Sequence, residues 1–250
     1  MELKFSGQRV LILGGSCELA LTLAELLIKE GLFPVVTWRS QKGEIRVKER
    51  LQPFSGEYGL ERLDMGSRTS IASLYAAIGH DLDYLVDFAH GDMESLIGAA
   101  NSHSIHNYFS ENVSFRAELL KRAARIMLKN RRGRLIFISS AAACKPSPGQ
   151  GFYAAAKLAC EALYRNLGLE LGSRGVTTLS LRPGYIDAGR GKAYLDQDSE
   201  AILRKVPTGK ALSCREVAET ILFFLSDSAT GFNATEINMD GGMTAGIKCG

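Results

Sequence analysis

The sequence has little of what marks membrane, secreted or metal-binding proteins. It contains no run of about 18 apolar residues and does not open with a basic segment followed by an apolar one, so neither a transmembrane span nor a signal peptide is expected. The five cysteines are scattered, without CxxC or Cys/His spacing, so no metal site is predicted and free thiols in a reducing cytoplasm are expected. A net charge of +3 gives no strong attraction to nucleic acid. We therefore expect a cytoplasmic protein that acts without membrane, metal or nucleic acid.

Short apolar runs alternate with amphipathic stretches along the 250 residues, 46% of which are hydrophobic. Strands are expected at about residues 9–13, 35–38, 59–63, 84–88, 135–138, 177–181 and 236–239. Helices are expected at about residues 18–30, 67–78, 104–129, 152–171 and 214–225. This alternation predicts a single α/β domain over residues 1–250, with a doubly wound parallel sheet of about seven strands and helices on both faces.

Three residues with matched chemistry stand close together in the sequence. Tyr153 and Lys157 are four apart on a predicted helix and therefore share one face, and Ser140 follows the strand before that helix. An ammonium beside a phenol lowers the pKa of the Tyr, which makes it a general acid or base for a carbonyl/alcohol pair. The Ser140 hydroxyl can hold the carbonyl oxygen. A YxxxK spacing also arises by chance, and Tyr153 would then be a core aromatic residue.

The turn after the first strand has the features of a dinucleotide site. Gly14, Ser16, Cys17, Glu18 and Leu19 lie between an apolar strand and the start of a helix. Small residues in such a turn, together with free helix N–H groups, fit a pyrophosphate. The alternative is an ordinary tight turn in which Ser16 is the N-cap of the helix.

With these motifs in place, the whole chain resembles the classical short-chain dehydrogenase/reductase family, most closely its 3-oxoacyl-(acyl carrier protein) reductases. The resemblance covers about residues 5 to 244 and implies a Rossmann-like fold. It makes Ser140, Tyr153 and Lys157 catalytic, together with Asn112, which would hold a water joining Lys157 to solvent. It also implies that Tyr153 and Lys157 contact the cofactor. The other residues expected to contact it are Gly14, Ser16, Cys17, Glu18, Leu19, Arg39, Asp64, Ala89, Pro183, Gly184 and Ile186. Residues 187–207 would form a lid over the substrate.

Arg39 decides the expected cofactor. It follows the second strand, where the resemblance places the adenosine ribose, and no acidic residue stands there. An arginine pairs with the 2′-phosphate of NADPH, so NADPH (NADP+) is favoured. The alternative is a solvated loop arginine.

Three departures from the family pattern lie on the cofactor side. Glu18 and Ala20 stand where the glycine turn usually has glycines, and Glu18 would compete with the pyrophosphate for the helix N-terminus. The family's Asn-Asn-Ala-Gly reads Asp-Phe-Ala-His at residues 87–90, and Ala188 replaces a usual Thr. His90 could approach the cofactor or be a loop residue without a role. These changes argue against tight or ordinary cofactor binding.

A basic cluster lies at residues 121–134, and the resemblance assigns acyl-carrier-protein docking to Arg131 and Arg174. The alternative is a solvated helix end whose Lys and Arg complement the helix dipole.

The sequence therefore predicts an NADPH-dependent ketoreductase that reduces a 3-oxoacyl group on acyl carrier protein to the 3-hydroxyacyl form, in fatty acid or polyketide biosynthesis. Tyr153 would donate the proton. Two alternatives stay open: a reductase of a small free carbonyl or polyketide substrate, and a cofactor-poor, non-catalytic subunit of a biosynthetic complex. By family likeness, residues 104–129 and 152–171 would pair with a second copy in a homodimer or homotetramer.

Overall fold

The computed structural model describes residues 2–246 and contains one seven-stranded parallel sheet of order β3-β2-β1-β4-β5-β6-β7. Its strands are β1 (Arg9–Leu13), β2 (Phe33–Trp38), β3 (Gly59–Arg62), β4 (Tyr84–Asp87), β5 (Gly133–Ile138), β6 (Val176–Pro183) and β7 (Thr235–Met239). The predicted doubly wound α/β fold is confirmed. Because all neighbouring strands are parallel, their carboxyl ends share one edge of the sheet.

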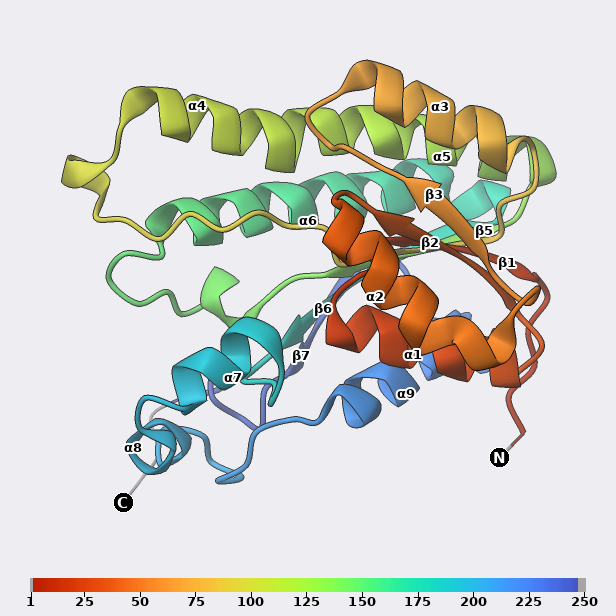
Figure 1. Ribbon diagram of the computed structural model, residues 1–250. Coiled ribbons are helices and arrows are strands. Elements are labelled where there is room, and N and C mark those ends of the chain that lie inside the picture. Colours follow the sequence, from red (N-terminus) through yellow and green to blue (C-terminus); the bar gives the residue numbers. More distant parts are fainter. Residues whose placement is uncertain (1, 247–250) are drawn as a thin grey trace.

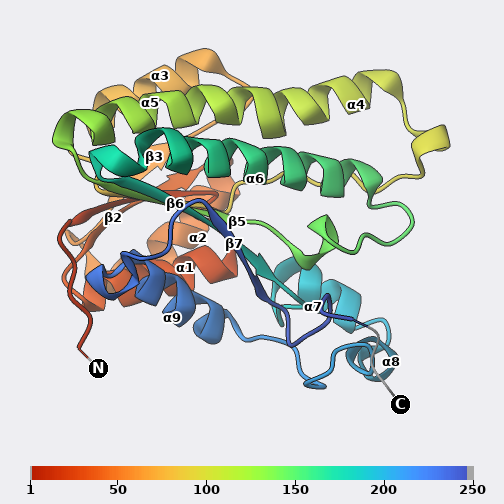
Figure 2. The same ribbon diagram turned by 180° about the vertical axis from the view of Figure 1, so that it is seen from behind.

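Helices cover both faces of the sheet (Figure 1). They are α1 (Glu18–Lys29), α2 (Gln41–Leu51), α3 (Arg68–Ile78), α4 (Ser102–Phe109), α5 (Phe115–Asn130), α6 (Gly151–Leu171), α7 (Gly189–Leu195), α8 (Ser199–Leu203) and α9 (Cys214–Leu225). One layer holds α3, α4, α5 and α6, and the other holds α1, α2 and α9, as the reverse view also shows (Figure 2). Within residues 2–246, no helix is long and apolar enough to cross a membrane.

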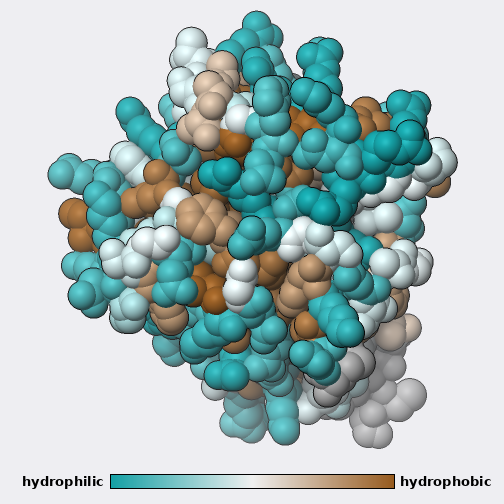
Figure 3. Space-filling model, turned by 90° about the vertical axis from the view of Figure 1, so that its right-hand side faces the viewer, coloured by the Kyte–Doolittle hydropathy of each residue, from teal (hydrophilic) through white to brown (hydrophobic). Residues whose placement is uncertain are grey.

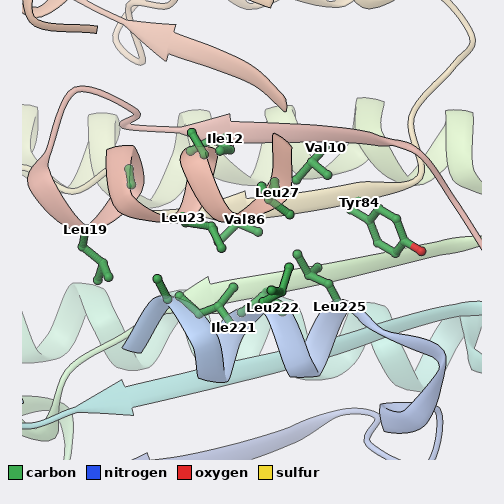
Figure 4. Packing of buried hydrophobic residues seen from close by; sticks show 14 of the residues in the cluster. Val10, Ile12, Leu19, Leu23, Leu27, Tyr84, Val86, Ile221, Leu222 and Leu225 are labelled. Atoms are coloured by element: carbon green, nitrogen blue, oxygen red, sulfur yellow. The ribbon is translucent and has the colours of Figure 1, made fainter. Parts of the chain in front are cut away.

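Side chains of β1 alternate between two separate cores. Val10 and Ile12 pack with α1 and α9, whereas Leu11 and Leu13 pack with the opposite layer. Figure 4 shows Leu23 of α1 and Ile221 of α9 on facing helices beneath the sheet. A strand buried on both faces has apolar residues in succession, which is the pattern that β1 shows. These cores fix the strand ends, where the polar residues gather.

Two features of the helices differ from the sequence prediction. The helix α2 was not expected, because only three of its residues, Gly43, Val47 and Leu51, are buried and the rest are mostly polar. Its N-cap is Ser40, whose hydroxyl accepts from the Gly43 N–H. The long helix predicted at 104–129 is interrupted by a π-helical turn, Ser110–Ser114, which separates α4 from α5.

The segment predicted as a lid forms two short helices. The helices α7 and α8 lie together at one end of the molecule, away from the turn that joins α5 to β5 (Figures 1 and 2). An isolated bridge between Ile186 and Leu212 closes this excursion at its base.

Candidate active site

The sheet topology gathers the predicted catalytic residues at the carboxyl edge. Ser140 follows β5, and Tyr153 and Lys157 lie on the first turns of α6. The hydroxyls of Ser140 and Tyr153 are hydrogen-bonded to each other. The Lys157 ammonium donates to the Ile138 carbonyl over 2.7 Å and lies 5.6 Å from the centre of the Tyr153 ring. Two hydroxyls therefore converge on one point, with a buried cation behind them.

The ionisation of this group differs from the sequence expectation. Burial raises the pKa of Tyr153 above its ordinary value, while Arg190 and the hydrogen bond from Ser140 oppose the rise. The sequence analysis expected a lowered pKa for Tyr153, and the net shift is in the opposite direction because desolvation is the largest effect. Burial, followed by the charge of Arg116, lowers the pKa of Lys157 to about 7. The ammonium is therefore itself close to losing its proton at neutral pH.

Asn112 lies at the centre of the π-helical turn. Its side-chain oxygen accepts from the Gly91 N–H over 2.7 Å, which ties the helix to the loop after β4. Its backbone carbonyl accepts from Arg116 Nη1 and, over 3.2 Å, from Cys160 Sγ. Both lone pairs of this carbonyl are thus used by protein donors. The water that the resemblance assigns to Asn112 stays a prediction.

Arg116 forms a buried ion pair that the sequence analysis missed. Its Nε lies 2.7 Å from Asp87 Oδ2, with side-chain exposures of 1% for Arg116 and 0% for Asp87. The Tyr164 hydroxyl donates to the same carboxylate over 2.9 Å, and Arg116 also donates to the Ala89 carbonyl. Asp87, where the family has an Asn, is therefore neutralised by this pair and faces the protein interior. The only sequence signal for this ion pair was Asp87, an acidic residue at the end of an apolar strand.

The turn after β1 packs closely against the loop after β4 and leaves the first N–H groups of α1 without a side-chain cap. Gly14 has a φ of +69°, and a Cβ on it would come within 2.7 Å of the Ala89 backbone nitrogen. The N-cap of α1 is Cys17, whose side chain makes no capping hydrogen bond, so the alternative with Ser16 as N-cap is wrong. Ser16 instead packs against Gly43 at the start of α2. The N–H groups of the first α1 turn can therefore bind an anion.

Glu18 does not leave an uncompensated charge at this turn. Its carboxylate accepts from Arg46 over 2.7 Å and from Arg50 over 3.2 Å, both on α2. The expected competition with a pyrophosphate is weakened by these two arginines. Arg39 is exposed, and its guanidinium has no hydrogen bond or ion pair within the part of the chain described. A free cation beside a helix N-terminus fits a phosphate-bearing dinucleotide.

The other predicted cofactor contacts lie along the same edge. Asp64, after β3, accepts from the Gly66 N–H, and Ala89, after β4, donates to Asp87. Gly184, after Pro183 at the end of β6, lies against Asp240, where a Cβ would come within 2.9 Å of the Asp240 Cα. Leu19 is buried, and Ile186 directly precedes residues 187–207 and forms an isolated bridge with Leu212. Asp64, Ala89 and Gly184 thus follow β3, β4 and β6 at the carboxyl edge of the sheet, the edge at which Tyr153 also lies.

Two residues that were not predicted as site residues, His90 and Arg190, contact Tyr153, and each is held by a further residue. The His90 ring meets the Tyr153 ring edge-on, with 5.1 Å between centres, and its Nε2 is 2.9 Å from the Tyr108 hydroxyl. Burial, and then the charges of Lys157, Arg116 and Arg190, lowers the pKa of His90, so its ring is neutral. Arg190 of α7 contacts both Tyr153 and Asp92. His90 therefore has contacts at the site, unlike a loop histidine without a role.

The predicted docking arginines lie together, but far from Tyr153. Arg131 precedes β5 and Arg174 precedes β6, and Gly175 packs on the Arg131 carbonyl. They occupy the amino edge, about 20 Å away along the six residues of β5 at roughly 3.3 Å per residue. Figure 3 shows the side of the molecule where α5 turns into β5, with largely hydrophilic side chains and smaller hydrophobic areas among them.

The basic cluster is smaller than its sequence suggests. Arg132 pairs with Asp83, and Arg134 is buried, donating to the carbonyls of Phe224 and Ser226. Arg134 therefore belongs to the interior, whereas Arg132 stays about half exposed with its charge paired to Asp83.

A parallel sheet with a glycine turn after its first strand is the architecture of dinucleotide-dependent oxidoreductases. A family model described as enoyl-(acyl carrier protein) reductase matches residues 17–244, and the chain belongs to the short-chain dehydrogenase/reductase family of NAD(P)-dependent oxidoreductases.

Similar proteins agree with this assignment. The 3-oxoacyl-[acyl-carrier-protein] reductase FabG of Salmonella typhimurium is 28% identical over 241 residues, which are 96% of this chain and 99% of the relative. A solved short-chain dehydrogenase/reductase family protein has a TM-score of 0.86 and 28% identity, with 98% of this chain and 100% of that chain covered. The actinorhodin polyketide ketoreductase with NADPH has a TM-score of 0.88 at 22% identity, covering 97% and 99%, and shows the same fold.

Proposed function

We propose that this protein is an NADPH-dependent ketoreductase that reduces a 3-oxoacyl group carried on acyl carrier protein to the 3-hydroxyacyl form. The observation that carries the proposal is the convergence of the Ser140 and Tyr153 hydroxyls in front of the buried Lys157. Reduction of a carbonyl needs a donor at the oxygen and a proton to complete the alcohol, and these two hydroxyls supply both.

The cofactor would be held along the carboxyl edge. The Gly14 turn and the N-terminus of α1 would hold the pyrophosphate, and the loop residues Ala89 and Gly184 would border the nicotinamide. When bound, the reduced nicotinamide supplies the hydride. NADPH is favoured over NADH because Arg39 is exposed, cationic and unpaired within residues 2–246, as pairing with a 2′-phosphate requires.

The protein's own residues would handle the proton. Ser140 donates a hydrogen bond to the carbonyl oxygen and orients it, and Tyr153 Oη gives up its proton to that oxygen. A raised pKa suits Tyr153 for this role, because the phenol stays protonated at neutral pH until the substrate oxygen becomes more basic. Lys157 provides a cation behind the phenol, and its lowered pKa lets it pass a proton on.

The substrate class draws support from two features. The FabG relative is named as a reductase of acyl-carrier-protein substrates, and the pair Arg131 and Arg174 offers an exposed basic surface for an acidic carrier. Because this pair lies at the opposite edge from Tyr153, we propose that a docked carrier serves the Tyr153 of a second copy. The exposed Leu158 and Leu169 on α6 give that copy an apolar face on which to pack.

A second candidate function is reduction of a free carbonyl compound. Tyr108, Phe109 and Phe152 form an aromatic cluster on the side of the site where His90 lies. This wall suits an apolar chain or ring whether or not a carrier holds it. The similarity in fold to a polyketide ketoreductase is consistent with this alternative.

A substrate panel separates these functions. NADPH oxidation would be followed with a carrier-linked 3-oxoacyl group, the same acyl group on a small thiol, a cyclic ketone and a carrier-linked enoyl group. The proposal predicts the highest kcat/KM for the carrier-linked ketone. Equal rates for linked and free ketones would favour the second candidate. Turnover of the enoyl compound alone would contradict carbonyl reduction, and failure to bind NADPH would indicate a non-catalytic subunit.

A further inference from the structure

Arg190 belongs to the lid, yet its guanidinium reaches the proposed proton donor. Its Nη2 donates to Tyr153 Oη over 3.3 Å, and its Cζ lies 4.9 Å from the centre of the Tyr153 ring. The two residues are 37 positions apart and come from α7 and α6. The contact therefore forms only when α7 rests over the carboxyl edge of the sheet.

A second contact holds Arg190 in this place. Its Nη1 lies 2.7 Å from Asp92 Oδ1, in the loop after β4, so one guanidinium joins the lid to the loop across Tyr153. The side chains of Arg190 and Asp92 are 51% and 56% exposed, respectively. An ion pair this exposed is weak, so it can open and close with the lid.

Every element around Tyr153 presents a polar group, but their roles differ. Ser140 hydrogen-bonds the hydroxyl from the loop after β5, and neutral His90 meets the ring edge-on, with Tyr108 of α4 beyond it. Lys157, on the same helix, donates to the Ile138 carbonyl and lies beside the ring. Asp92 is linked to the site by the hydrogen bond that it accepts from Arg190. Arg190 is therefore a cation whose hydrogen bond ends on the reacting oxygen itself.

We propose that Arg190 is a catalytic residue delivered by the lid, and that its guanidinium stabilises the negative charge shared by Tyr153 Oη and the substrate oxygen during proton transfer. The inference rests on the proposed function, since it assumes carbonyl reduction. The carbonyl carbon takes the hydride from the reduced nicotinamide, and the carbonyl π pair moves to the oxygen. A new O–H bond then forms at that oxygen as the O–H bond of Tyr153 breaks, and solvent later returns the proton to the phenolate.

The charge balance at Tyr153 agrees with this role. Burial raises the pKa of Tyr153, and the Arg190 charge is the strongest influence in the opposite direction. The negative charge of Asp92 raises the pKa of Tyr153. Asp92 therefore holds Arg190 in place but partly offsets the effect of Arg190 on Tyr153. Fixed charges aimed at a developing oxyanion are an effective form of catalysis because they need no reorganisation during the reaction.

Arg190→Ala tests the proposal, with Lys192→Ala as the matched control. Lys192 is on the same lid helix but pairs with Asp187 and Asp196. We expect kcat of ketone reduction to fall about tenfold in Arg190→Ala, with KM little changed, and the alkaline limb of the kcat profile to move up by about one pH unit. Millimolar guanidinium should restore part of the rate, because the Arg190 side chain is half exposed and leaves an open space. Lys192→Ala should match wild type and show no rescue.

A second readout separates this inference from the proposed function. If the wild-type protein reduces no ketone in the panel, the proposed function fails. The inference is then decided by ¹³C NMR of Cζ-labelled tyrosine, with the Tyr153 signal identified by its loss in Tyr153→Phe. The pKa of Tyr153 should be higher by about one unit in Arg190→Ala. An unchanged Tyr153 titration overturns the inference. In an active enzyme, unchanged kcat and pH profile also overturn it, as does a rise in KM alone, which would make Arg190 a substrate anchor.

Discussion

Replacing Asp87 with Asn, the residue usual in the family, should destabilise this protein. The Asp87 carboxylate is fully buried and lies 2.7 Å from Arg116 Nε, which is 1% exposed, so removing its charge leaves a buried, uncompensated guanidinium. Breaking such a pair by removing one partner costs about 3–5 kcal/mol. For a chain of this size, a loss of that order lowers Tm by about 6–20 °C. Because Arg116 also donates to the Asn112 and Ala89 carbonyls, kcat should fall as well.

A double-mutant cycle tests the cause. Arg116→Met should be destabilising by itself, and Asp87→Asn with Arg116→Met should lose at least about 2 kcal/mol less than the sum of the single changes. Urea unfolding followed by circular dichroism measures each free energy. Glu219→Gln is the control, because it breaks an exposed pair with Arg215 and should cost at most about 1 kcal/mol. Additive single effects, or an Asp87→Asn protein as stable as this control, would refute the importance of the buried pair.

Three further outcomes are expected. Arg39→Ala should weaken NADPH binding at least tenfold and leave NADH nearly unchanged, since a charged hydrogen bond is worth roughly 1.5–3 kcal/mol; fluorescence titration showing equal losses would make Arg39 structural. Arg131→Glu with Arg174→Glu should raise KM for a carrier-linked ketone and leave a free β-ketoester unaffected; unchanged kinetics with the linked substrate would remove this docking site. Lys157→Met should raise the free energy of unfolding, because burial lowers the pKa of Lys157 from 10.5 to about 7 and the buried ammonium opposes folding. The gain in unfolding free energy over wild type is full below pH 7 and shrinks between pH 7 and 10.5, where the buried Lys157 loses its proton. Urea unfolding should therefore show a larger gain at pH 6 than at pH 9, and an equal gain at both would contradict the lowered pKa of Lys157.

The strands and most long helices could be predicted because burial imposes a regular apolar pattern on them. The strand β1 is apolar in succession since both of its faces are covered, and α9 has a buried side opposite a polar one. The helix α2 was not predicted because only three of its residues are buried, which is too few to give a clear apolar period. The π-helical turn at Asn112 escaped prediction because its residues, Ser110–Ser114, include no Gly or Pro that would signal a break in the helix.

The site could be predicted only where neighbouring residues carry the chemistry. Tyr153 and Lys157 share a helix face, so their approach follows from spacing, and Ser140 follows from the shared edge of parallel strands. Pairs between distant elements left no such pattern: Arg116 meets Asp87 across 29 positions, and Arg190 meets Tyr153 across 37. Geometry of this kind depends on how α5 and α7 pack, which local sequence does not encode.

The proposal that Tyr153 supplies the proton is tested most directly by ketone reduction in Tyr153→Phe. This change removes one hydroxyl from a buried ring and keeps its aromatic volume. NADPH oxidation with the best ketone of the panel should fall at least about 100-fold, the lower range for loss of a general acid, while NADPH affinity barely changes. Tyr194→Phe is the control, since that tyrosine of α7 stacks on Tyr185 and the variant should react as wild type does. Wild-type turnover in Tyr153→Phe would contradict the assignment of Tyr153 as the acid.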